Sequence, residues 1–132
     1  MLDNLMVETF AEEVHLSVAL NARLCFERLK RSADMDAHQN ICEYVMIVGH
    51  AISDIPDLEA EYRQISSAGR ALDDIFELVQ AGSVPSEQRL APILVGINAM
   101  DAVIGSGLVK TGKLYQAEKQ VQEALRARQQ AA

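Results

Sequence analysis

The segment 90–109 constrains the fold of this chain more than any other, because it is apolar on almost every side. Its conventionally polar side chains are Asn98, Asp101 and Ser106. A helix that is apolar all round is either buried in a protein or spans a membrane. A carboxylate in the middle of a span costs about 2.5–3.5 kcal/mol, so Asp101 argues against a span. We therefore predict a central, buried helix near residues 90–106.

The regular part of this helix is expected from about Ala91 to Ile104. Pro92 then falls in the first turn, where its missing N–H is not needed. Ser86 is a second candidate N-cap, and a helix beginning there is expected to kink at Pro92. Two glycines, at 105 and 107, provide the stop signal.

Apolar residues spaced by three and four predict four more helices, over about residues 3–31, 36–53, 57–81 and 111–128. No segment alternates apolar and polar residues as a strand does. We therefore predict an all-α, single-domain bundle of four to five helices that comprises residues 1–132, with the last few residues frayed.

Three features suggest more apolar helix surface than one small bundle can bury. The first predicted helix would be about 42 Å long at 1.5 Å per residue. The third carries a heptad seam, which consists of Leu58, Tyr62, Ile65, Gly69, Leu72, Phe76 and Val79. The last carries a narrow stripe that we take as a candidate interface, formed by Leu114, Val121 and Leu125. Uncovered strips of this kind mark protein contacts, and a symmetric dimer is the commonest solution.

The charge pattern opposes general nucleic-acid binding, because the net charge is −7. The middle of the chain is acidic and the last predicted helix is basic. The two regions either form a solvated charged surface or pair within one chain or between two. Cys25 and Cys42 lie among apolar residues and are read as reduced core thiols. The N-terminus shows no signal peptide, so we expect a cytoplasmic protein.

Four motifs resemble catalytic or metal-binding sites but lack required parts. Residues 107–113 fit G-x-x-x-x-G-K, yet Leu114 replaces the Ser or Thr that would bind magnesium, and a helix rather than a strand precedes them. Residues 12–15 supply one half of a di-iron motif. His38 and Cys42 need a third ligand to hold zinc. Neither His15 nor His50 has the basic surroundings of a phosphate-accepting histidine. We expect no metal and no cofactor.

Asn98 and Asp101 are the polar pair that the sequence singles out. They lie three residues apart on an otherwise apolar helix, so their side chains are neighbours. A buried carboxylate must be paired or protonated, and we therefore expect Asp101 to be partly buried with a polar partner. The pair is either a structural hydrogen-bond or ion-pair site or the floor of a ligand pocket.

These patterns favour a small, non-catalytic interaction or regulatory protein that acts through helix faces as a homodimer. One alternative is a helical bundle that binds a small molecule, or acts as an enzyme, around Asn98 and Asp101. Another is an acidic inhibitor that mimics nucleic acid through its carboxylates at 54–61 and 73–77. We expect no nucleic-acid partner and no membrane association.

Overall fold

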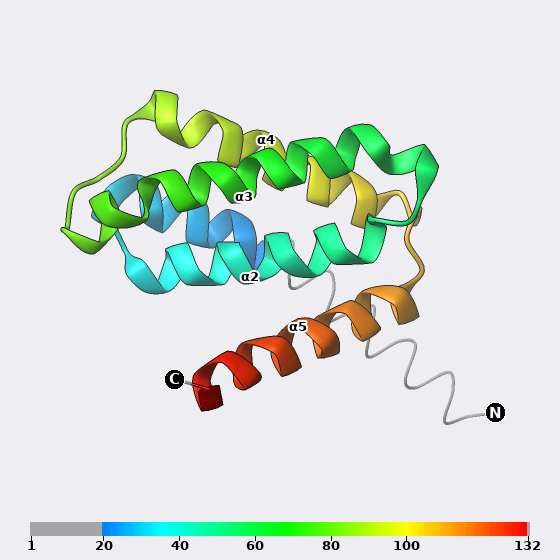
Figure 1. The fold of residues 1–132 in the computed structure, drawn as a ribbon. Helices are drawn as coiled ribbons and strands as arrows, with labels where there is room; N and C mark the ends of the chain where they lie inside the picture. The colour runs from blue at the N-terminus through cyan, green and yellow to red at the C-terminus, as the bar shows by residue number, and fades with distance from the viewer. Residues whose placement is uncertain (1–19, 132) are drawn as a thin grey trace.

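The computed structural model describes residues 20–131, and this part of the chain is an all-α bundle of five helices without strands (Figure 1). The first helix is described over residues 20–32. It is followed by four full helices and one short 3-10 turn, namely α2 (Met35–Ile52), η1 (Pro56–Leu58), α3 (Glu59–Gln80), α4 (Glu87–Gly105) and α5 (Thr111–Ala131). The all-α prediction is confirmed. The expected length of the first helix and the half-motif at 12–15 lie outside the described residues.

Helix α2 begins where the sequence provides a cap. The Asp34 side chain accepts a hydrogen bond from the Ala37 N–H at 3.1 Å, which satisfies one of the open donors of the first turn. The connector before it is shorter than predicted, because Ala33 turns the chain sharply with a φ of 49°. Helix α2 therefore starts at Met35, close to the predicted boundary.

The limits of α4 follow from two glycines and a serine. Gly82 takes a φ of +81° just after α3, a conformation that glycine adopts without strain. Ser86 then caps α4, since its side chain accepts from the Arg89 N–H at 3.3 Å. The predicted start at Ala91 is wrong, and the alternative start after Ser86 holds. The helix continues through Pro92 and stops before Gly107, whose φ is +70°.

Helix α4 is buried on one side only, which differs from the prediction of a central helix. Its inner side joins the core, with Leu90, Ile93, Gly96, Ile97, Met100 and Val103. On its outer side, Leu94 and Val95 remain 38% and 46% exposed. Within residues 20–131, the helices that contact it cover part of its circumference and leave its apolar outer side exposed.

The core lies between α2, α3, α4 and helix 20–32. Helix α3 makes its most extensive contacts with α4 and also packs on α2. Four residues of the predicted seam are buried, namely Leu58, Ile65, Leu72 and Val79. Tyr62 and Phe76 are partly exposed, because α3 turns a second set of small and apolar residues toward α4.

Helix α5 packs against α2 through the stripe that the sequence offered as an interface. Leu114 and Val121 are only 3% and 7% exposed, and Leu125 is partly buried against the core. The stripe is therefore covered within the chain, which removes the reason for assigning it to a dimer contact. Within residues 20–131, no helix has the length and hydropathy needed to cross a membrane.

Candidate functional site

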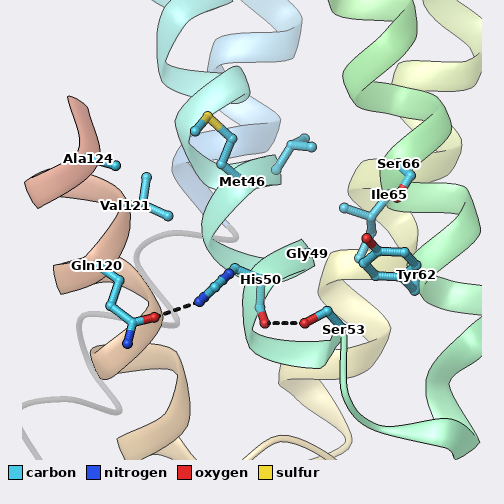
Figure 2. A pocket seen from close by; sticks show the side chains of 11 residues that line it. Met46, Gly49, His50, Ser53, Tyr62, Ile65, Ser66, Gln120, Val121 and Ala124 are labelled. Atoms are coloured by element: carbon cyan, nitrogen blue, oxygen red, sulfur yellow. Dashed lines mark hydrogen bonds between the residues drawn. The ribbon is translucent and has the colours of Figure 1, made fainter. Parts of the chain in front are cut away.

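A groove with a volume of about 560 Å³ lies between α2, α3 and α5 (Figure 2). It exists because α5 packs on α2 and makes no comparable contact with α3. Residues from all three helices line it, namely Val45, Met46, Gly49, His50, Ser53, Tyr62, Ile65, Ser66, Gln120, Val121 and Ala124. This volume lies in the range of natural ligand sites, about 300–1,000 Å³.

The floor of the groove is apolar. Val45, Ile65 and Val121 are buried, whereas Met46 and Tyr62 are exposed. Gly49 contributes no side chain, and a β-carbon placed there would lie 3.6 Å from Cγ2 of Ile65. The floor is therefore suited to apolar groups of a partner.

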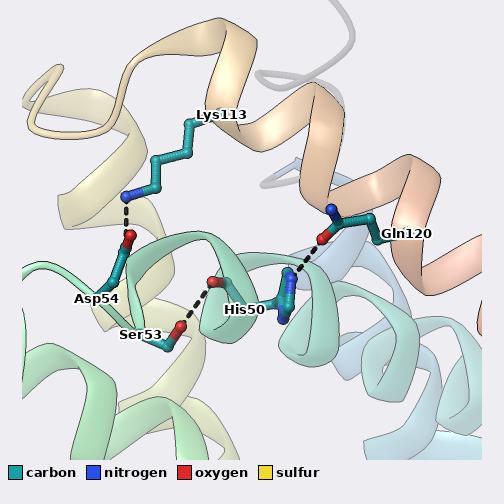
Figure 3. Close-up of polar contacts among 5 residues, drawn as sticks. All are labelled: His50, Ser53, Asp54, Lys113 and Gln120. Atoms are coloured by element: carbon teal, nitrogen blue, oxygen red, sulfur yellow. Dashed lines mark hydrogen bonds and ion pairs between the residues drawn. The ribbon is translucent and has the colours of Figure 1, made fainter.

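Polar contacts at one end of the groove tie α5 to the end of α2 (Figure 3). His50 Nε2 lies 2.6 Å from Gln120 Oε1, and since this oxygen can only accept, the ring nitrogen donates. The Ser53 hydroxyl donates to the His50 carbonyl at 2.9 Å. Lys113 and Asp54 form an ion pair, and this hydrogen bond lowers the pKa of Asp54. These contacts hold one wall of the groove in place.

The groove can bind a partner molecule, because it offers apolar area and a few hydrogen-bonding groups. Among the residues that the structure describes, those that line the groove include neither a carboxylate nor a lysine or arginine. His50 is hydrogen-bonded to an amide rather than to a nucleophile or an acid. The geometry therefore favours recognition of an uncharged apolar surface over acid–base chemistry at this place.

The polar pair of α4 lies elsewhere and has a partner from the first helix. Arg23 donates from Nη2 to Asn98 Oδ1 at 2.8 Å and forms an ion pair with Asp101. The side chain of Asp101 is 26% exposed and that of Arg23 is 45% exposed. Asp101 is partly buried with a polar partner, as predicted. Neither Asn98 nor Asp101 lines the groove, and a ligand site around them stays a prediction.

His38 and Cys42 are neighbours in α2 but serve the core. The buried ring of His38 donates from Nε2 to the Leu72 carbonyl at 2.7 Å. Its Nδ1 lies 3.8 Å from Cys42 Sγ, and its ring lies 5.7 Å from that of Phe76. Over residues 20–131 no three His, Cys, Asp or Glu side chains gather as a metal site would require. The described contacts of this pair are therefore those of core residues.

The phosphate-loop pattern at 107–113 joins α4 to α5, as the sequence indicated, and a helix precedes it. Two of the acidic residues considered for nucleic-acid mimicry are paired within the chain: Asp54 with Lys113, and Glu59 with Arg63. The acidic middle and the basic last helix thus make at least one contact inside the chain.

A second surface, which we call the outer face of α4, combines apolar character with exposure. Its exposed residues recur at helical spacing along one side, namely Ala91, Leu94, Val95, Asn98, Ala102 and Gly105. The flanking carboxylate, Asp101, is neutralised by Arg23. Leu20 and Leu24 are also strongly exposed, on the helix that supplies Arg23.

The chain matches no known protein family, and comparisons with curated proteins and with solved structures give no match. The groove and the outer face of α4 are therefore the two candidate functional surfaces of the described residues. Sequence reasoning missed both of them. The outer face of α4 was visible in the sequence as surplus apolar residues, but those residues were assigned to a core. The groove has no sequence signal, because it results from α5 packing on α2 without a comparable contact with α3.

Proposed function

We propose that this protein is a small, non-catalytic interaction protein that works as a homodimer through the outer face of α4. One observation carries the proposal: Leu94 and Val95 are 38% and 46% exposed on α4, in a stretch from Leu90 to Met100 that holds no charged residue. Scattered exposed apolar residues are normal, but a continuous apolar face on a helix marks a contact surface. A symmetric dimer is the commonest way in which a soluble chain covers such a face.

The groove supports the interaction role independently of the dimer. It is lined by α2, α3 and α5, whereas the proposed dimer contact belongs to α4. A dimer formed through α4 therefore leaves both grooves open to the apolar side chains of a partner protein. Cys25 and Cys42 are free thiols, which supports a place in a reducing compartment such as the cytoplasm.

Light scattering at micromolar concentration tests the proposal. The expected mass of the natural chain is twice 14.5 kDa. Leu94→Glu should give a monomer with an unchanged helical circular dichroism spectrum, because two carboxylates would be buried in the contact. Val84→Glu is the matched control, since Val84 is exposed in the connector before α4, and it should stay dimeric.

A monomeric natural chain would reject the proposal. An equal loss of mass in both variants would show that the outer face of α4 has no special part in the contact. The Val121 position is unsuited to this test, because Val121 is buried against α2 and a glutamate there would damage the fold itself.

A further inference from the structure

The groove between α2, α3 and α5 matches one face of a further helix in length. Figure 2 shows α2 with α5 on one side of it and α3 on the other. Along α2 the groove runs from Val45 to Ser53, which is about 12 Å at 1.5 Å per residue. An amphipathic helix binds a groove through apolar side chains at i, i+3, i+4 and i+7, which span about 10 Å. Two turns of such a helix therefore fill the groove from end to end.

The residues that line the groove allow a helix backbone to come close. Each of the three helices contributes a small residue, namely Gly49, Ser66 and Ala124. Met46 and Tyr62 also line the groove and are 40% and 38% exposed. Methionine adapts its shape to its partners, and both residue types are enriched at protein interfaces. The groove therefore combines room for a backbone with two large side chains that can pack on an apolar face.

Carboxylates lie at one end of the groove. Ser53 and Tyr62 line both the groove and a neighbouring recess, so the two hollows are continuous at this end. Asp54 and Glu59 line the recess, and their side chains are 70% and 68% exposed. A molecule that fills the groove can therefore reach both carboxylates with its end.

This end of the groove has an excess of negative charge. The segment 54–61 contains four carboxylates and neither lysine nor arginine. Two of them, Asp54 and Glu59, form ion pairs with Lys113 and Arg63. Pairs this exposed contribute little to stability, so a basic side chain of a partner can share either carboxylate. The net charge of −7 also attracts a basic partner and repels an acidic one.

We propose that the groove binds a basic, amphipathic helix of a partner protein. The apolar face of this helix packs on Val45, Ile65 and Val121, and its basic side chains reach Asp54 and Glu59. The inference rests on the interaction role proposed above but not on the homodimer, because no residue of the groove belongs to the outer face of α4.

Binding of three synthetic peptides to the full chain, measured by fluorescence anisotropy, tests the proposal. Each peptide has about 14 residues with leucine at i, i+3, i+4 and i+7. They differ at two positions of the last turn, which hold lysine, glutamine or glutamate. The lysine peptide should bind most tightly, the glutamine peptide about threefold more weakly and the glutamate peptide about tenfold more weakly. These differences should shrink as the salt concentration rises, because salt screens exposed charges.

Met46→Gln tests the apolar contact. The substitution makes the groove more polar at an exposed position, so the fold should persist while the lysine peptide binds about fivefold more weakly. Leu94→Gln is the matched control, because Leu94 is 38% exposed but lies on the outer face of α4. It should leave the affinity for the lysine peptide within about twofold of that of the natural chain, since the two sites are independent.

Glu59→Gln tests the ionic contact. It should weaken binding of the lysine peptide about threefold and leave binding of the neutral glutamine peptide unchanged. Glu87→Gln is the matched control, because it makes the same change of charge at an exposed site of α4 that does not line the groove. It should alter the affinity for the lysine peptide by less than about twofold.

Equal affinities for the lysine and glutamine peptides would overturn the proposal, because the carboxylates would then take no part. A loss of binding in Leu94→Gln but not in Met46→Gln would also overturn it and place the peptide on the outer face of α4. A natural dimer that Met46→Gln converts to a monomer would show a second copy in the groove instead. A monomeric chain that binds the lysine peptide as expected would reject the homodimer alone, and a dimer that binds none of the peptides would reject the groove proposal alone.

Discussion

Gly96 of α4 lies so close to Ala68 of α3 that no β-carbon fits between them. A β-carbon added to Gly96 would overlap the β-carbon of Ala68 and lie 3.2 Å from the Gln64 carbonyl oxygen. Because atoms of a helix backbone cannot withdraw as the end of a side chain can, the two helices would have to move apart. This close contact lies in the most extensive helix pair of the bundle.

Gly96→Ala should therefore destabilise the protein by about 1–3 kcal/mol, the usual cost of overpacking a core. Gly69→Ala is the matched control, because a β-carbon there would lie 3.4 Å from Cγ1 of Val45. That is close to ordinary contact, and alanine favours a helix over glycine by up to about 1 kcal/mol. Urea denaturation should show the two variants shifted in opposite directions or, at least, Gly96→Ala clearly the less stable. Equal midpoints would contradict the observed helix contact.

The helices were largely predictable because their ends are marked locally. The side chains of Asp34 and Ser86 each accept a hydrogen bond from a backbone N–H three residues later, and Gly82 follows the end of α3. Signals of this kind act over a few residues and can be recognised in the sequence. The start of α4 was misplaced because Pro92 was given the first turn, whereas the hydroxyl of Ser86 caps the helix earlier.

The packing and the functional surfaces were less predictable, because they depend on contacts between distant parts of the chain. Arg23 is 78 residues from Asp101, and no spacing rule connects them. Periodicity showed that α4 is apolar all round but did not show which side its neighbours cover. Gly69 belongs to the predicted seam of α3, but the tighter helix contact is at Gly96, which no predicted seam included.

The two histidines of α2 should differ in their effect on stability. His38 is buried, donates to the Leu72 carbonyl and contacts the ring of Phe76. His38→Ala should therefore cost about 1–3 kcal/mol, from the lost hydrogen bond and the cavity left behind. His50→Ala, at an exposed position, should stay within about 0.5 kcal/mol of the natural protein. Thermal or urea unfolding of the two variants measures this, and a larger loss for His50→Ala would contradict the assignment of His38 to the core.

Cys42 should react slowly with thiol reagents in the folded protein. Burial raises the pKa of its thiol from 9.0 to about 11, and the Asp73 carboxylate adds to this effect. The thiolate is the reactive form, so a rise of this size lowers its fraction about 100-fold near pH 8. In a Cys25→Ala background, alkylation should be slow in buffer and fast in urea. Rapid alkylation of the folded chain would show that Cys42 is more accessible than its position in α2 indicates.

Glu118 should make the protein less stable as the pH rises. This side chain of α5 is half-buried, and burial together with the nearby Glu43 raises its pKa above 4.5. A carboxyl group whose pKa is higher in the folded state binds its proton more tightly there than in the unfolded chain. Its contribution is therefore favourable below the unfolded pKa and is lost as the pH rises through the folded pKa.

Glu118→Gln removes this titration and should be more stable than the natural protein at about pH 7, with the difference shrinking toward about pH 4. Glu123→Gln is the matched control, because Glu123 is exposed on the same helix, and its difference from the natural protein should vary little with pH. Urea unfolding at both pH values gives the two differences directly. If Glu118→Gln were less stable at neutral pH, the hydrogen bond from Gln122 Nε2 to the Glu118 carboxylate at 3.4 Å would outweigh the cost of burial and the repulsion from Glu43.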